Sequence, residues 1–205
     1  YASGLGQTNF IHGTGALSGG RLVSASAMIV ARDGCNVGLY DSPGGYKVTS
    51  TLRPPASNPG CGVIFAMTDE FFRTGKGSFW EAMVITTPVT DSPYGLFYIA
   101  HVSYDQLAGE QRLFYTYIPW FGPSVLPLVD YLFEVTVAHV PATISSVHIT
   151  FKATWSSGGT KNNWVEHTTT IGDGNNPDTI ALGTAVGLRA YIGGTQFVNL
   201  CAFQQ

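Results

Sequence analysis

Apolar and β-branched residues occur along this chain in short runs of roughly five to ten residues. Gly, Pro, Asn or Asp interrupts each run, and an i, i+3, i+4, i+7 spacing never persists for about a dozen residues. The pattern predicts an all-β chain. We expect strands over Gly20 to Ala31, Asn36 to Tyr40, Tyr46 to Leu52, Gly62 to Met67, Phe79 to Thr87, Gly95 to Val102, Leu113 to Ile118, Tyr131 to His139, Ser146 to Trp155, Trp164 to Ile171, Ala185 to Tyr191 and Phe197 to Phe203.

The number of runs predicts the architecture. About a dozen strands are too many for one twisted open sheet, so we expect two packed antiparallel sheets, a β-sandwich. Gly193-Gly194 lies between the last two runs and predicts a closing hairpin, because glycine enters positive φ freely. Residues 1–205 are predicted to form a single domain, with residues 1–19 as an extended N-terminal arm.

Four longer connections separate the predicted strands. They cover Pro54 to Gly60, Thr68 to Gly77, Trp120 to Asp130 and Gly172 to Asp178. Loops of this kind commonly carry binding function when a rigid scaffold holds them. We therefore expect a binding site among them.

Charge narrows the classes of partner. Charged residues make up 11% of the chain, with ten basic and thirteen acidic residues and a net charge of −3. The sequence has no Lys/Arg cluster that could bind along a phosphate backbone, so nucleic acid is not expected as a partner. No apolar run approaches the roughly 20 residues that span a bilayer, so no membrane insertion is expected. Low charge with 13% aromatic residues fits packing against further copies or a larger assembly.

The chain begins at Tyr1 rather than at a methionine, so we expect a processed product or a piece of something longer. Its three cysteines, Cys35, Cys61 and Cys201, show no metal-type spacing. Buried free thiols are expected, because cysteine is among the most buried residue types. A bridge between Cys35 and Cys61 is the alternative.

The order of the runs resembles a known family. The closing segment Ala185 to Phe203 reads AVGLRAYIGGTQFVNLCAF, and Tyr46 to Phe65 reads YKVTSTLRPPASNPGCGVIF. Between these two segments lie an aromatic-led run at Phe79 and the run DYLFEVTV from Asp130. In this order the chain resembles the concanavalin A-like sandwiches, the laminin-G and glucanase group. The resemblance implies a jelly-roll sandwich and carbohydrate as the natural small ligand.

Glucanase relatives place two carboxylates on one strand, in a Glu-x-Asp-x-x-Glu pattern or close to it, and hydrolysis needs such a pair. This chain lacks the pattern. Asp69 and Glu70 are adjacent and would face opposite sides of a strand. The other candidates each stand alone: Glu81, Glu110, Glu134 and Glu166. We expect a non-catalytic member, and a hydrolase only if carboxylates from different strands converge. Arg189 is expected to be a solvated or rim charge.

Aromatic faces stack on sugar rings, while amides bind the hydroxyls. The candidate ligand-binding residues are therefore Trp120, Trp164, Phe71, Phe72, Asn162 and Asn163. For the aromatic residues the alternative is that each plugs the end of the core. Asp173, Asn175 and Asp178 could bind calcium through oxygen donors, as laminin-G-like domains do, although such an Asx-rich segment is also an ordinary turn. No other cofactor is expected.

These observations predict a non-catalytic recognition or adhesion module that binds a glycan. We expect it on a larger extracellular or virion assembly, such as a phage fibre or decoration protein. Its expected location is therefore extracellular or at the virion surface, with oligomerisation open. The alternatives are a purely structural subunit of such an assembly and a glucanase-like glycoside hydrolase.

Overall fold

A computed structural model describes residues 8–32, 45–57, 60–86, 95–105, 107–120, 124–139, 146–156, 162–172 and 185–205. Within these residues the chain forms fourteen strands and one short helix. The elements are β1 (Thr8–His12), β2 (Gly15–Ser18), β3 (Arg21–Ser24), β4 (Met28–Arg32), β5 (Tyr46–Arg53), β6 (Cys61–Met67), α1 (Asp69–Thr74), β7 (Lys76–Ile85), β8 (Leu96–Asp105), β9 (Gly109–Ile118), β10 (Tyr131–His139), β11 (Val147–Ser156), β12 (Asn162–Ile171), β13 (Ala185–Ala190) and β14 (Gln196–Gln204).

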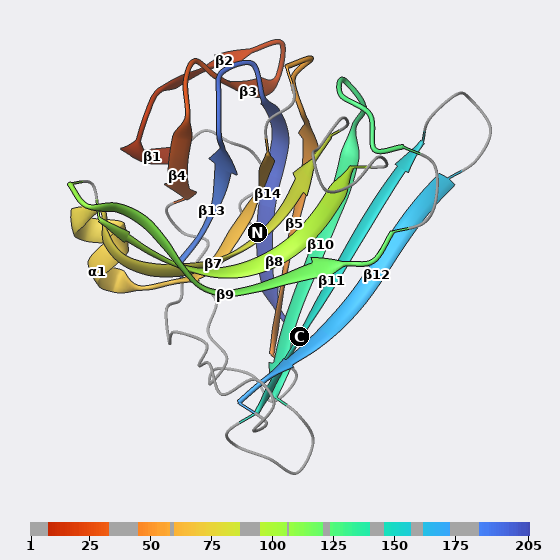
Figure 1. The fold of residues 1–205 in the computed structure, drawn as a ribbon. Coiled ribbons are helices and arrows are strands. Elements are labelled where there is room, and N and C mark those ends of the chain that lie inside the picture. The colour runs from red at the N-terminus through yellow and green to blue at the C-terminus, as the bar shows by residue number, and fades with distance from the viewer. Residues whose placement is uncertain are drawn as a thin grey trace.

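The strands form two antiparallel sheets. In the described residues sheet A has the order β1-β4-β13-β6-β7-β8-β9, and sheet B has the order β12-β11-β10-β5-β14-β3-β2. Figure 1 shows β7, β8 and β9 curving across the molecule while β10, β11 and β12 run side by side in the other sheet. The predicted all-β, two-sheet antiparallel sandwich is confirmed.

The main core lies between the sheets. β5 and β11 alternate strictly between buried and half-buried positions until the end of β11, so each turns one face inward. Phe97 of β8 lies in this core, and its ring centre is 5.4 Å from Trp155, 6.0 Å from Phe151 and 6.4 Å from Phe133. Phe97 therefore joins sheet A to three aromatic side chains of sheet B.

A second apolar cluster covers the outer face of sheet A. It includes Ile64, Met67, Phe71, Phe79 and Met83. This cluster explains why every residue of β6 is buried, although strands with one solvated face normally alternate. Part of the cover comes from α1, whose N-terminus is capped when the Thr68 hydroxyl accepts the Phe71 N–H at 3.3 Å.

The N-terminal region differs from the sequence prediction. The run Gly20 to Ala31 is two strands, because β3 pairs in sheet B and β4 pairs in sheet A. Residues 8–18 form β1 and β2, which pair with β4 and β3, rather than an extended arm. β1 and β2 therefore each add an edge strand, β1 to sheet A and β2 to sheet B. The expected strand Asn36 to Tyr40 lies outside the described residues.

The closing hairpin prediction is wrong. β13 pairs with β4 and β6 in sheet A, whereas β14 pairs with β5 and β3 in sheet B. The glycine pair turns the chain from one sheet to the other, and the Gly194 N–H donates to the Ser24 carbonyl at 2.7 Å. A Cβ on Gly193 would lie 2.5 Å from the Ala25 carbonyl oxygen, so this turn needs glycine to approach the β3–β4 connection.

Two further features bear on the sequence predictions. Cys61 is a buried free thiol whose pKa is raised by burial, and Cys201 is a half-buried free thiol. Cys35 lies outside the described residues. Over the described ranges, no helix is long and apolar enough to cross a membrane.

We predict that Phe97→Ala lowers the free energy of unfolding by about 3–5 kcal/mol, because it empties a site between the sheets. Urea denaturation measures this loss. Leu107→Ala is the control, since Leu107 is 99% exposed at a turn and should change stability by less than about 0.5 kcal/mol. Equal stability of the two variants would contradict the central role of Phe97.

Candidate functional site

A carboxylate lies at the centre of the outer face of sheet A. Glu81 is in β7, paired with Ile64 of β6 on one side and with Ala100 of β8 on the other. Its neighbours Trp80 and Ala82 point into the main core, so alternation directs Glu81 outward. The side chain is nevertheless 0% exposed. A buried carboxylate requires partners, and the surrounding strands supply them.

Two strands, β13 and β8, and the residue that follows β13 contribute partners to Glu81. The Arg189 Nη1 of β13 donates to Glu81 Oε2 at 2.5 Å. The Tyr98 hydroxyl of β8 donates to Glu81 Oε1 at 3.1 Å, and the Tyr191 hydroxyl lies 3.4 Å from the same oxygen. Arg189 Nη2 also forms an ion pair with Glu110 of β9. One guanidinium therefore joins two carboxylates that are far apart in the sequence.

The electrostatics follow from this burial. Desolvation raises the pKa of Glu81, and the Arg189 charge opposes the rise only in part. Burial works against protonated Arg189, but Glu81, Tyr191 and Glu110 outweigh it and raise the pKa of this guanidinium. Burial, followed by the charge of Glu81, also raises the pKa of Tyr98 and of Tyr191. Both phenols therefore stay protonated and act as hydroxyl donors near neutral pH.

Aromatic and cationic side chains lie above the buried cluster. The Arg112 guanidinium is 5.5 Å from the Tyr98 ring centre and 5.2 Å from that of Tyr115, and its Nη2 donates to the Tyr191 hydroxyl at 3.2 Å. The rings of Tyr115 and Tyr117 are perpendicular with centres 4.4 Å apart. We call this region the tyrosine–arginine surface: Tyr104, Arg112, Tyr115, Tyr117 and Tyr191.

A depression of about 150 Å³ opens beside the tyrosine–arginine surface. His12, Tyr104, Glu110, Arg189 and Tyr191 contribute to its lining. Its volume equals that of about five water molecules at roughly 30 Å³ each. The depression therefore offers hydroxyl, carboxylate and guanidinium groups to a small polar group of a ligand.

Glu81 and Glu110 bear on the question of hydrolysis, because they meet at one guanidinium. Two carboxylates from different strands do converge, contrary to the expectation that Glu81 and Glu110 stand alone. However, glycoside hydrolysis requires both carboxyl groups to reach the scissile bond. Glu81 is fully buried beneath Arg189, Tyr98 and Tyr191. Its role in this structure is to position those side chains.

The sequence contained a signal for this cluster. Glu81 is the one charged residue within the apolar run FWEAMVI, and Arg189 is the one charged residue within AVGLRAY. A charge in a strand that is buried on both faces needs a counter-charge. The expectation that Arg189 is a solvated or rim charge is therefore wrong, since its side chain is 5% exposed.

Two predicted ligand-binding aromatics are part of the packing. Trp120 is half-buried, with its ring centre 4.9 Å from Trp155 and 6.4 Å from Phe97. It closes one end of the main core. Phe71 is 0% exposed and packs on Phe79 at 4.9 Å, because α1 lies over the outer face of sheet A. Phe71 lies beneath the tyrosine–arginine surface, since its ring centre is 5.8 Å from that of Tyr104 while the side chain itself is buried.

Trp164 does present an exposed face. It is 59% exposed on β12, where it points to the outer side of sheet B. Asn163 precedes it in the strand and points to the opposite side, so these two side chains do not form one site. Asn162 begins β12, but the side chains of Asn162 and Phe72 lie outside the described part of the chain. Asp173, Asn175 and Asp178 also lie outside it, and no group of three His, Cys, Asp or Glu among the described residues could hold a metal.

The fold and the site define a two-sheet β-sandwich with a polar, tyrosine-rich cluster on one outer face. No family model matches the chain, and no curated protein matches it in sequence. Among solved structures, the chain is similar to an alginate lyase Aly36B variant in complex with alginate trisaccharide, with a TM-score of 0.51 and 11% identity over 98% of this chain and 88% of that chain.

Two further solved structures match more distantly. A second Aly36B variant, in complex with alginate tetrasaccharide, has a TM-score of 0.48 and 14% identity over 92% of this chain and 82% of that chain. The receptor-binding domain of botulinum neurotoxin type G has a TM-score of 0.40 and 8% identity over 98% of this chain and 42% of that chain. At these identities the likeness concerns the fold.

We predict that Arg189→Met lowers the free energy of unfolding by about 3–5 kcal/mol at pH 7, because it leaves the Glu81 carboxylate buried and unpaired. The double variant Glu81→Leu/Arg189→Met should recover most of this loss, since buried ion pairs are often replaced by apolar residues at little net cost. Urea denaturation of both variants and the wild type measures the effect. A double variant as unstable as Arg189→Met would contradict it.

The free energy of unfolding lost in Arg189→Met should depend on pH, and urea denaturation at two pH values measures this dependence. The pKa of Glu81 is higher in the folded protein than in the unfolded chain, where it is about 4.3. The stability that protonation of Glu81 contributes is therefore complete below about pH 4.3 and is lost as the pH rises through the pKa of the folded state. Removing the Arg189 charge raises the folded pKa further. The stability lost in Arg189→Met relative to the wild type should therefore be smaller at pH 5 than at pH 7.

Proposed function

We propose that this chain is a non-catalytic recognition module that binds a glycan chain across the outer face of sheet A. The observation that carries the proposal is the tyrosine–arginine surface held over the buried Glu81–Arg189 pair. Tyr117 is 51% exposed, and Arg112 is exposed beside Tyr115. The surface thus combines aromatic faces, hydroxyl groups and a guanidinium in one place.

A saccharide matches this combination. The apolar faces of sugar rings pack on aromatic side chains, while hydroxyl and guanidinium groups bind the sugar hydroxyls. The depression lined by His12, Tyr104 and Glu110 adds polar groups at one end of the surface. The fold shared with an alginate lyase solved with alginate trisaccharide supports a saccharide as ligand.

The absence of catalysis is part of the proposal. Glu81 is covered and its oxygens are engaged by Arg189 and Tyr98. The raised pKa of Tyr191 disfavours the phenolate that a general base requires. We further propose that the module is carried at an extracellular or virion surface, where the low charge and high aromatic content of the chain suit packing into a larger assembly.

We predict that Tyr117→Ala and Arg112→Ala each weaken glycan binding about tenfold, because each removes a group that contacts the sugar. Isothermal titration calorimetry measures the affinity, with alginate oligosaccharides and neutral β-glucan oligosaccharides as the first ligands. Leu17→Ala is the control, since Leu17 is an exposed apolar residue of β2 in the other sheet.

Three outcomes would contradict the proposed function. Affinities that stay unchanged in both sheet A variants would remove the tyrosine–arginine surface from binding. Release of reducing ends from an oligosaccharide by the wild type but not by Glu81→Gln would show that the protein is catalytic. A glycan array without any bound glycan would also count against a saccharide ligand.

A second candidate is a purely structural subunit of a larger assembly. The exposure of several large apolar side chains favours it: Leu17, Leu107, Leu113, Tyr117, Leu126, Leu128, Leu132 and Trp164. Such a subunit should associate, so its molar mass by light scattering after size-exclusion chromatography should rise with concentration. A constant monomer mass up to high concentration would contradict this candidate.

A further inference from the structure

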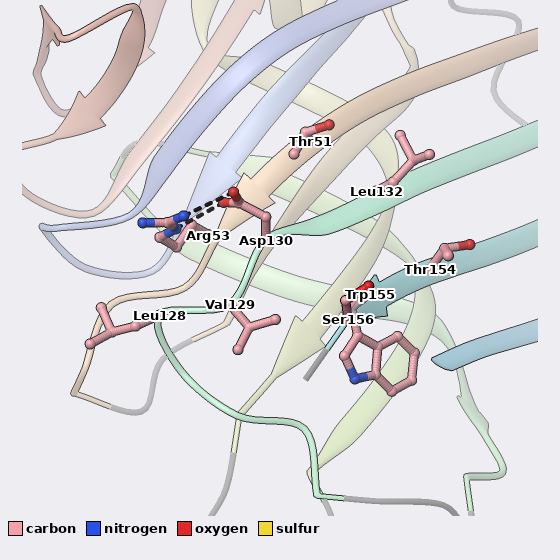
Figure 2. A pocket seen from close by; sticks show the side chains of 9 residues that line it. All are labelled: Thr51, Arg53, Leu128, Val129, Asp130, Leu132, Thr154, Trp155 and Ser156. Atoms are coloured by element: carbon pink, nitrogen blue, oxygen red, sulfur yellow. Dashed lines mark hydrogen bonds and ion pairs between the residues drawn. The ribbon is translucent and has the colours of Figure 1, made fainter. Parts of the chain in front are cut away.

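A second surface feature lies on the opposite sheet. A groove of about 530 Å³ runs over the outer face of sheet B, where β5, β10 and β11 lie side by side. Figure 2 shows the side chains of Thr51, Leu132 and Thr154 along these strands, with Arg53 and Asp130 at one end. The groove is separate from the tyrosine–arginine surface, which belongs to sheet A.

The charged end of the groove has an excess of positive charge. Asp130 accepts two hydrogen bonds from Arg21, both at 3.0 Å, and two from Arg53, at 2.8 and 2.9 Å. Burial works against ionised Asp130, but the two guanidinium groups hold its pKa below the ordinary value. One negative and two positive charges leave a net charge of +1. The Arg53 side chain is 34% exposed, so a ligand can reach it.

Thr51, Leu132 and Thr154 line the groove and begin a cross-strand row, which continues beyond the groove to Trp164. Thr51 pairs with Leu132, Leu132 with Thr154, and Thr154 with Trp164 on the edge strand β12. Adjacent strands lie about 4.8 Å apart, so the row spans roughly 14 Å. Hydroxyl groups therefore alternate with an aliphatic and an exposed aromatic side chain along one line. This sequence of groups is suited to a chain of sugar rings with polar edges and apolar faces.

The rim of the groove is held in a strained conformation. Leu128 has φ 60°, a backbone region that residues other than glycine rarely adopt, and its N–H donates to the Pro54 carbonyl at 3.0 Å. The leucine side chain is 58% exposed. Residues in sparsely populated backbone regions cluster at binding sites, and Leu128 is exposed whereas Ala66, which has φ 48°, lies in the core. This observation is independent of the charge at Asp130.

We infer that the groove is a second carbohydrate site, which takes acidic sugar residues of the uronic acid type. The sugar carboxylate binds at the Arg53 guanidinium, the sugar hydroxyls contact Thr51 and Thr154, and the ring faces pack on Leu132 and Trp164. Arg53 Nε and Nη2 donate to Asp130, so a charge-assisted hydrogen bond from Nη1 favours an acidic sugar over a neutral one. The hydroxyl and aromatic row favours a sugar over an acidic peptide. The inference does not depend on the proposed site in sheet A.

The test uses the variant Arg112→Ala/Tyr117→Ala, in which the tyrosine–arginine surface is disabled. Calorimetric titration with an alginate hexasaccharide should show residual binding in this background. Adding Arg53→Gln or Trp164→Ala should weaken it about tenfold. Arg53→Gln leaves Asp130 paired with Arg21, so the fold of the groove is retained. Lys152→Gln is the matched control, because it removes one positive charge from the same face outside the groove.

Cellohexaose is the neutral probe and hexaglutamate is the peptide probe. Binding of the alginate hexasaccharide that is unaffected by Arg53→Gln and Trp164→Ala would overturn the inference. Equal loss in Lys152→Gln, or equal binding of hexaglutamate, would reduce the groove to general charge attraction and also overturn it. If Arg112→Ala/Tyr117→Ala binds the alginate hexasaccharide as tightly as the wild type does, the proposed site on sheet A is refuted but the groove is not. The two failures are therefore distinguishable.

Discussion

The buried ion pair between Glu81 and Arg189 is the interaction on which the outer face of sheet A depends. It joins β7 to β13 across the intervening β6, where Gly62 is paired with Arg189. The same guanidinium lies 4.5 Å from the Tyr191 ring and binds Glu110. Because an unpaired charge at this depth costs several kcal/mol, the pair is expected to stay formed and to position Tyr98 and Tyr191, which it contacts. The same contact therefore contributes to stability and to the position of Tyr191.

The two outer faces of the sandwich differ because sheet A carries a second apolar cluster and sheet B does not, within the described residues. On sheet A, α1 and the side chains of Met83 and Tyr98 exclude water, so a polar site can be built there only around a buried charge pair. On sheet B, the outward residues of β5 and β11 are half-buried and include many threonines, so a groove forms with little desolvation. One fold thus supports two kinds of polar surface.

The sequence predicted the scaffold well and the site poorly, for physical reasons. Alternation in Tyr46–Arg53 and Val147–Ser156 reports burial directly, so these strands were predictable. The Gly193-Gly194 turn is compatible with a hairpin or with a change of sheet, and only the pairing partners decide between them. Glu81, Glu110 and Arg189 come from separate strands, and their contact depends on register that a single sequence does not reveal. The opposite orientations of Asn163 and Trp164, in contrast, follow from strand alternation alone.

The use of charge connects the two surfaces. The chain has only ten basic and thirteen acidic residues, yet seven of them form two compact networks. Glu81, Glu110, Arg112 and Arg189 lie on sheet A, and Arg21, Arg53 and Asp130 lie on sheet B. Charges placed only for solubility would be dispersed, because surface pairs contribute about 0–1 kcal/mol each. The two saccharide sites that we propose lie on opposite faces of the sandwich, and together they would let one module contact two segments of a polymer. Binding of the first segment then raises the local concentration of the second, so the overall affinity can exceed that of either site.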